Sequence, residues 1–268
     1  MATLSRIPFR KLTLLLGLLL LPSLPAQQAE EPMVSLNLRF FPIHRQNIPN
    51  LFLQSSPGTF EPVTLRNRLR SDPHEYEGPP RVVLFHRHER PEDGEEFFTP
   101  ATAVTVNQSS GDVLIFLMPP GIGGGINRDD WTIIAIDDRQ ESFPNGTMRV
   151  LNATGVNLSG FVGEQPISLG YAVSAPFVPP RPRRADRNAP LPVMFALDLE
   201  PGHELVFANT LQIPDDGRSI LVLRPPRRTR SIQIDTFLLE EPTRGFTQLE
   251  REAEEAAANG AAPPPTSD

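Results

Sequence analysis

Apolar and polar residues alternate in short runs along most of the chain. In residues 34–41, for example, Leu36, Leu38 and Phe40 occupy every second position. A period of two places these side chains on one face of an extended backbone, which is typical of a β-strand. Runs of four to nine residues separated by turn residues indicate antiparallel sandwiches rather than alternating strands and helices. The predicted strands are residues 34–41, 62–66, 81–88, 103–106, 113–118, 131–136, 148–152, 156–162, 192–199, 204–208, 219–223 and 232–239.

One ten-residue segment occurs twice. Residues 111–120 (GDVLIFLMPP) align without gaps with residues 217–226 (GRSILVLRPP), and the glycine, the apolar middle and both prolines match. Each copy leads to a further predicted strand, which indicates an internal repeat. We therefore expect an all-β protein with two tandem antiparallel β-sandwich domains, at residues 33–140 and 145–241. The alternative is one continuous sandwich whose two edges have similar sequences.

These two units carry a resemblance to a known type of protein. The first strand of the second unit ends near an R-x-x-N-like turn, from Arg149 to Asn152, and each unit is rich in strands and about 100 residues long. In these features most of 33–241 resembles bacterial exported proteins with tandem immunoglobulin-like domains of unknown function. The resemblance implies a location in the cell envelope or at the cell surface and a role as a binding or assembly module. It implies no catalytic residues.

The beginning of the chain has the pattern of a signal peptide. Arg6, Arg10 and Lys11 precede an apolar run at residues 12–21, and a proline-containing stretch ends in a small residue. We expect cleavage of residues 1–26. The alternative is an uncleaved anchor, but this ten-residue run, broken only by Thr13 and Gly17, is about half as long as a membrane span requires. We therefore expect no integral membrane span after cleavage.

Composition and charge indicate where the protein is located and which partners are excluded. The chain has no cysteine, which excludes disulfide frameworks, thiol nucleophiles and zinc sites built from cysteine. An exported chain without cysteine suits a bacterial periplasm or cell surface better than a eukaryotic secreted protein. Removal of residues 1–26 leaves 22 basic and 32 acidic residues, so the net charge becomes −10. Export and negative charge together argue against nucleic acid as a partner.

The C-terminal segment differs from the rest of the chain. Residues 243–260 contain a run of strong helix formers, with Thr247 as a possible N-cap and Glu250 three residues later. We expect a short helix there, followed by a disordered, proline-containing tail at residues 261–268. Either the helix packs weakly on the second domain through its few apolar side chains, or it is solvated.

Arginine clusters are the main candidates for ligand binding. They lie in or beside two predicted long polar loops, residues 67–80 and 179–190. Guanidinium groups suit carboxylates, phosphates and sulfates, so these clusters suggest an anionic envelope polymer or a lipid head group as a ligand. The alternative, which we favour, is that they pair with the many acidic residues and keep the loops soluble. The arginines concerned are Arg66, Arg68, Arg70, Arg181, Arg183, Arg184 and Arg187.

Evidence for enzymatic chemistry is weak. His86 and His88 share one side of a predicted strand, and with Glu89 or Glu92 they form a candidate site for a divalent metal in a metal-assisted hydrolase. A polar strand face without metal is the interpretation we prefer. No G-x-S-x-G elbow is present, and the glycine-rich stretch at 119–126 leads into a predicted strand instead of a phosphate-binding helix.

The sequence therefore favours a non-enzymatic protein of the cell envelope that needs no cofactor. We expect it to be a structural or protein-interaction module whose partner is another envelope protein or an anionic polymer.

Overall fold

The computed structural model is all-β in the part of the chain that it describes. The chain divides into two units, Met1–Pro32 and Met33–Asp268, and every strand lies in the second. The prediction of an all-β protein is thus confirmed, and no described residue belongs to a helix long and apolar enough to cross a membrane. The described residues are 32–44, 51–65, 69–92, 94–120, 131–179, 190–199, 202–213, 217–226 and 231–242. The predicted signal peptide (1–26), C-terminal helix (243–260) and tail (261–268) lie outside them.

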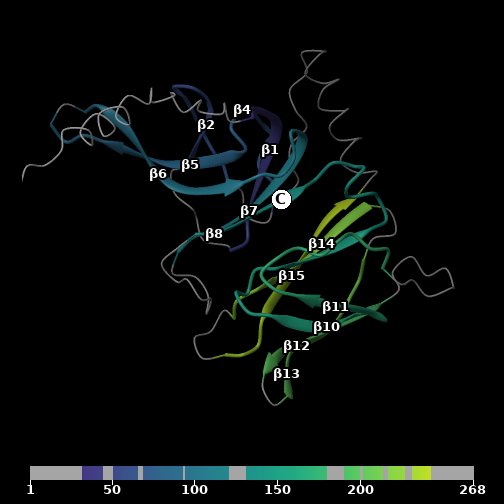
Figure 1. Ribbon diagram of the computed structural model, residues 1–268. Helices are drawn as coiled ribbons and strands as arrows, with labels where there is room; N and C mark the ends of the chain where they lie inside the picture. The colour runs from purple at the N-terminus through teal and green to yellow at the C-terminus, as the bar shows by residue number, and fades with distance from the viewer. Residues whose placement is uncertain are drawn as a thin grey trace, which may run out of the picture. The chain divides into compact units, whose positions relative to one another are not determined.

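The strands between residues 34 and 137, which we call the first half, form two four-stranded sheets (Figure 1). Their orders are β4-β1-β7-β8 and β3-β2-β5-β6. The strands are β1 (Val34–Pro42), β2 (Leu51–Ser56), β3 (Thr59–Pro62), β4 (His74–Gly78), β5 (Arg81–Glu89), β6 (Glu96–Thr105), β7 (Ser110–Met118) and β8 (Thr132–Asp137).

The strands between residues 148 and 242, which we call the second half, form a three-stranded and a four-stranded sheet. Their orders are β15-β14-β9 and β11-β10-β12-β13. The strands are β9 (Met148–Asn152), β10 (Leu158–Val162), β11 (Gln165–Leu169), β12 (Leu191–Leu199), β13 (Gly202–Leu211), β14 (Gly217–Arg224) and β15 (Asp235–Pro242).

Corresponding strands pair in the same way in the two halves. β1 pairs in parallel with β7, and β9 pairs in parallel with β14, so one sheet in each half is mixed and not antiparallel throughout as predicted. β7 and β14 then pair antiparallel with β8 and β15. Two isolated antiparallel bridges, Met148 to Phe177 and Leu151 to Val173, put residues 173–177 beside β9, where β4 lies beside β1. The repeated ten-residue segment therefore supplies the strand at the same position of each half.

The middle of each copy is continuously apolar because both faces of the strand are buried there. On β7, one set of alternate side chains packs into the core of the first half, and the other set packs into a third core. β14 divides in the same way between the core of the second half and the third core. A strand buried on both faces has a continuous apolar sequence instead of an alternating one. The members of the third core on these strands are Leu114, Phe116, Met118, Ile220 and Val222.

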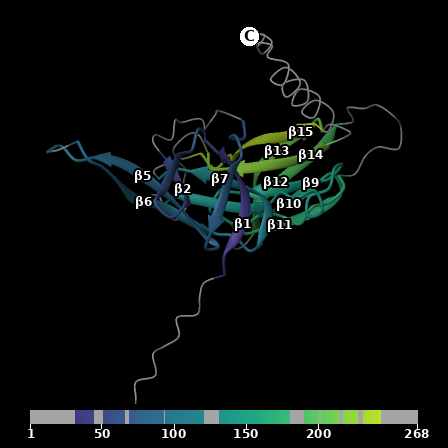
Figure 2. The ribbon, with the colours of Figure 1, turned by 90° about the horizontal axis from the view of Figure 1, so that it is seen from above.

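The third core joins the two halves. Phe41 and Ile43 from the first half are buried in it, as are Leu151 and Leu239 from the second half. Sheets β4-β1-β7-β8 and β15-β14-β9 therefore each use one face for their own sandwich and the other face for this contact. Figure 2 shows β7 next to β14 and β15, seen from above.

The residues predicted to form an R-x-x-N-like turn, Arg149 to Asn152, lie in strand β9 instead. Asn152, the last residue of β9, is fully buried, and its side chain forms hydrogen bonds to the neighbouring loops. Its Nδ2 donates to the carbonyl oxygens of Val156 (2.7 Å), Leu169 (3.1 Å) and Gly170 (2.9 Å). Its Oδ1 accepts hydrogen bonds from the backbone N–H and the hydroxyl of Thr154. A buried amide with this many partners is part of the scaffold, since loss of the side chain would leave several buried groups unpaired.

Several strands differ from the sequence prediction. β4 lies inside the stretch expected to be a long loop, residues 67–80, and β2 and β11 were not predicted. β3 ends at Pro62, where the prediction begins its second strand. β4 (HEYEG) is short and polar and buries only Tyr76 and Gly78, so its sequence resembles that of a loop. Its position depends on pairing with β1, which is a tertiary effect.

Candidate functional site

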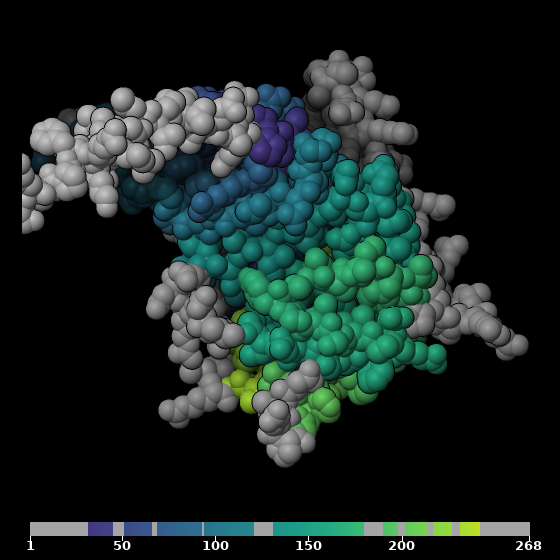
Figure 3. Space-filling view, in the orientation of Figure 1, coloured from purple at the N-terminus to yellow at the C-terminus, as the bar shows by residue number. Residues whose placement is uncertain are grey.

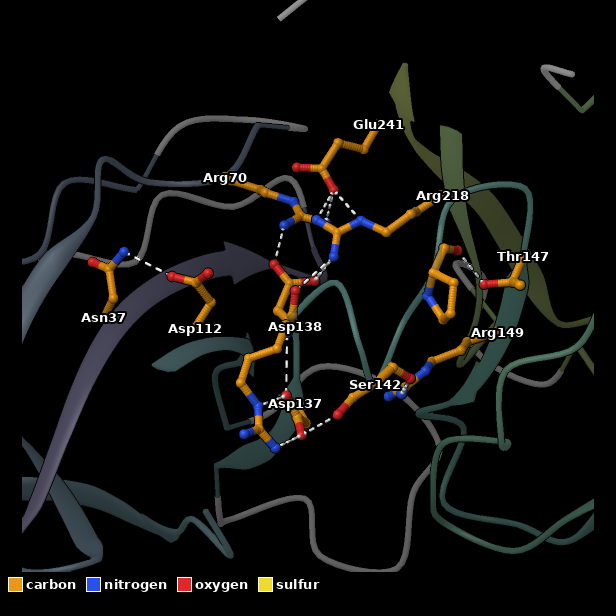
Figure 4. Close-up of polar contacts among 12 residues, drawn as sticks. Asn37, Arg70, Asp112, Asp137, Asp138, Ser142, Thr147, Arg149, Arg218 and Glu241 are labelled. Carbon is orange, nitrogen blue, oxygen red and sulfur yellow. Dashed lines mark hydrogen bonds and ion pairs between the residues drawn. The ribbon is translucent and has the colours of Figure 1, made fainter. Parts of the chain in front are cut away.

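A cluster of charged side chains lies where the two halves meet, and we call it the charged joint (Figure 4). Arg70, before β4, and Arg218, on β14, both form ion pairs with Asp138, which follows β8. Both arginines also pair with Glu241 on β15, and Nε of Arg218 is 2.8 Å from its Oε2. Asp138 is 5% exposed and the two arginines are 11–12% exposed. Two positive and two negative charges thus neutralise one another inside the protein.

The chain that links the halves is held by aromatic and hydrogen-bond contacts. Phe143 is fully buried, and the guanidinium groups of Arg149 and Arg218 lie 4.9 Å and 5.2 Å from the centre of its ring. Nη2 of Arg149 also donates to the carbonyl oxygen of Ser142 at 2.6 Å. Burial lowers the pKa of Arg149, which lies on β9. These contacts make the linker a fixed part of the structure.

At the charged joint, the pKa values of two adjacent carboxyl groups, Asp137 and Asp138, shift in opposite directions. Burial raises the pKa of Asp138 against the opposing effect of Arg70 and Arg218. Hydrogen bonds from Arg139 and Ser142 lower the pKa of Asp137 to about 2. Because the two arginines and two carboxylates of the joint form ion pairs with one another, the joint fits a structural role better than ligand binding.

Of the seven arginines singled out by sequence, the structure describes only Arg70. Its guanidinium is mostly buried and bound to the two carboxylates of the charged joint. The other six, Arg66, Arg68, Arg181, Arg183, Arg184 and Arg187, lie outside the described residues, so anion binding by these loops stays a prediction.

His86 and His88 lie on β5 in aromatic surroundings. Their ring centres are 6.5 Å apart. The ring of His86 lies 6.2 Å from that of Trp131, and the ring of His88 stacks on Phe97 at 5.1 Å. His88 Nε2 is 2.8 Å from the hydroxyl of Thr99. Within the described ranges, no three His, Cys, Asp or Glu side chains form a group suited to a metal ion. Metal-assisted hydrolysis stays a prediction.

The outer face of sheet β3-β2-β5-β6 is covered by phenylalanine rings. Phe60 stacks on Phe98 with ring centres 3.9 Å apart and meets Phe85 edge-on at 5.1 Å. Phe52 meets Phe98 at 5.3 Å, and the guanidinium of Arg87 lies 5.8 Å from the centre of the Phe52 ring. All four rings are half-buried. This face therefore hides much of its apolar surface by packing its own side chains together.

The outer face of sheet β11-β10-β12-β13, which we call the open face, is different. Figure 3 shows it turned toward the viewer, in teal and green. Phe161, Met194 and Leu205 are 48%, 47% and 53% exposed there. They line a hollow of about 530 Å³ together with Pro166, Ser168, Ser159, Ala196 and His203. None of the described residues that line the hollow is Lys, Arg, Asp or Glu.

Strand register explains the hollow. One cross-strand row runs Ser168, Ser159, Ala196 and Leu205, so it is small except at its last position. The next row on the same face runs Pro166, Phe161, Met194 and Ala208, so it is larger in the middle. Same-face rows lie about 7 Å apart along a strand. The small row therefore forms a trench and the larger row forms a ridge beside it.

Gly160 allows β10 and β12 to approach closely below this surface. A Cβ atom at Gly160 would lie 1.9 Å from the carbonyl oxygen of Met194 and 2.8 Å from the ring of Phe195. Phe195 is fully buried and fills the space over the glycine. The strands beneath the hollow are thus packed too tightly to accept a larger residue there, which gives the open face a rigid base.

Comparison with models of known protein families gives no match, and comparison with curated proteins gives no significant match.

The open face was missed at the level of sequence. A signal for it exists, because Phe161 and Met194 are large apolar residues at the positions that alternate with the buried Val162 and Val193. A strand whose two alternating sets both contain large apolar residues has a second face that needs a partner or exposes apolar surface.

Proposed function

We propose that the protein is a non-enzymatic interaction module of the bacterial cell envelope. It is exported by its N-terminal segment to the periplasm or the cell surface. There it holds two tandem immunoglobulin-like β-sandwich domains in a fixed arrangement and binds a protein partner on the open face. The observation that carries the proposal is the uncharged hollow between Phe161, Met194 and Leu205.

Physical properties of the molecule support this function. An exposed apolar patch with a concave centre is typical of an interaction site. The fully buried linker residue Phe143 and the charged joint resist relative motion of the halves, so a partner meets a preformed surface. The equivalent strand orders and parallel pairs support the tandem-domain interpretation.

Site-specific photocrosslinking in the cells that produce the protein tests the proposal. Benzoylphenylalanine replaces Phe161 on the open face or Phe97 on β6, which are both strand phenylalanines and are 48% and 41% exposed. We expect a covalent adduct with another polypeptide at position 161 and not at position 97. Absence of an adduct at 161, or equal adducts at both positions, would contradict the proposed function.

A further inference from the structure

We propose that the partner on the open face is a second copy of this chain, bound face to face about a two-fold axis. This inference rests on the proposed function and identifies the occupant of the hollow.

The first argument is shape. The ridge of Phe161 and Met194 lies beside the trench of Ser168, Ser159 and Ala196 on the same surface. A two-fold axis that lies parallel to the sheet, along the cross-strand rows and midway between ridge and trench, turns the two faces toward each other and places the ridge of each copy over the trench of the other. Such an interface is isologous, because one patch supplies both the protruding and the receiving surface. Two sheets that pack in this way keep their strands within about 30° of each other.

The second argument is charge. The chain has 32 acidic and 25 basic residues, so two copies repel each other overall. Among the described residues that line the hollow, none has a carboxylate, an ammonium or a guanidinium group. Two copies can meet there without burying like charges. The same property gives the hollow no attraction for an anionic polymer.

The third argument is the way in which the chain already packs its own sheets. The outward side chains of β7 and β14, among them Phe116 and Val222, form the third core between two sheets. Each half thus buries one outward sheet face against a sheet of similar strand order. The open face offers the same chemistry, with apolar side chains at alternate positions, and it has no covering sheet among the described residues.

The area of the open face limits the affinity of the dimer. Four strands about 4.8 Å apart, with a common length of five residues at about 3.3 Å each, give a footprint on the order of 300 Å². A standard interface buries about 800 Å² on each partner. The dimer is therefore weak and depends on protein concentration.

Sedimentation velocity of the purified protein over a range of concentrations tests the inference. We expect a monomer–dimer equilibrium. Leu205→Glu places a charge at the end of the trench and is expected to weaken the dimer at least about tenfold. Phe97→Glu is the matched control, since it adds the same charge at a comparably exposed residue of β6, and it is expected to leave the equilibrium unchanged.

A second variant separates a shaped interface from general stickiness. Ala196→Phe fills the trench while it adds apolar surface, so it is expected to abolish the dimer. Stronger association of Ala196→Phe would overturn the inference, as would a monomeric wild type or a dimer that Leu205→Glu leaves intact. Circular dichroism and thermal melting check that each variant is folded, and an unfolded Ala196→Phe is replaced by Ser168→Phe, which fills the same row.

Because the chain has no cysteine, a single introduced cysteine gives an independent result. Facing sheets pack about 10 Å apart, which is too far for a direct disulfide. A bismaleimide long enough to span the interface is therefore expected to link Met194→Cys into a covalent dimer, whereas Phe97→Cys is expected to stay monomeric. The adduct formed by photocrosslinking at position 161 distinguishes the two proposals. A product of two identical chains supports both. A product with a different protein preserves the proposed function and overturns this inference, and no product overturns the proposed function.

Discussion

Sheets β3-β2-β5-β6 and β11-β10-β12-β13 have equivalent strand orders, but the apolar side chains on their outer faces are exposed to different extents. Both faces carry large apolar side chains. On the first, Phe60, Phe85 and Phe98 interlock and are half-buried. On the second, Phe161 and Met194 remain about half exposed beside a row of small residues. Strand topology therefore does not determine whether an outer face is closed or open; the side chains at outward positions do.

The difference separates a face that stabilises its own sheet from one that is available to a partner. Closing a face with aromatic rings adds contacts within the chain. Leaving a ridge and a trench provides shape, but little stability until a partner arrives. The sheet faces at the third core are fully covered, since Phe116 is completely buried there. They show how a sheet face behaves once another sheet packs on it.

We expect the largest difference in the effect of a Phe→Ala substitution on unfolding free energy between the covered face at the third core and the open face. Phe116→Ala leaves a cavity next to Phe41, whose ring centre is 5.6 Å away, and is expected to lower the free energy of unfolding by about 3–5 kcal/mol. Phe161→Ala removes the same group from an exposed position and is expected to cost about 0.5 kcal/mol or less in the monomer. Urea unfolding at low protein concentration measures both. Similar losses for the two variants would show that the open face is covered.

A substitution on the closed outer face, that of sheet β3-β2-β5-β6, is expected to cause an intermediate loss of unfolding free energy. Phe60→Ala removes a ring that stacks on Phe98 at 3.9 Å, so we expect a loss of about 1–2 kcal/mol in unfolding free energy. Gln54→Ala is the control, since Gln54 faces Phe60 across the β2–β3 pair and is not aromatic. Equal effects of the two substitutions would contradict the view that the rings stabilise this face.

These differences also show which features can be inferred from sequence. The all-β class and the repeated central strands are local properties, because continuous burial of β7 and β14 produces aligned apolar runs at residues 114–117 and 220–223. β4 was missed because its five residues include only two buried ones, and its placement depends on pairing with β1.

The open face depends on information that no single segment contains. Phe161 lies beside Met194 because of the register between β10 and β12, and Leu205 reaches the same surface through a register shift between Phe195 and Ala196. The charged joint is similar, since Arg70 and Asp138 are 68 residues apart in the chain. Sequence identified Arg70 as a cation but gave no way to find its partners.

The adjacent carboxyl groups of Asp137 and Asp138 also differ in burial, so they affect the pH dependence of the unfolding free energy differently. Asp137 is near the surface, and its pKa in the folded protein is about 2, below the usual 3.8. A lowered pKa means that ionised Asp137 stabilises the fold above pH 3.8 and that this contribution is lost as the pH falls toward 2. Because its partner Arg139 is exposed to solvent, the contribution is about 1 kcal/mol.

Asp137→Asn is therefore expected to abolish about 1 kcal/mol of the loss in unfolding free energy between pH 4 and pH 2. Burial raises the pKa of Asp138, so its protonation acts in the opposite direction, and this effect is common to both proteins and cancels in the difference. Urea unfolding at several pH values gives the comparison. Parallel profiles for the variant and the wild type would show that Asp137 does not provide this stabilisation.

The smallest expected effect concerns the polar edge of the closed face. The guanidinium of Arg87 lies over the Phe52 ring and pairs with Glu96 at 3.4 Å, but Arg87 is 48% exposed and its pair is screened by water. Arg87→Gln is therefore expected to lower the free energy of unfolding by only about 0.5 kcal/mol. Arg81→Gln, at an exposed arginine of the same strand, controls for the change in net charge. A loss for Arg87→Gln as large as that for Phe60→Ala would mean that the cation, and not the stacked rings, closes this face.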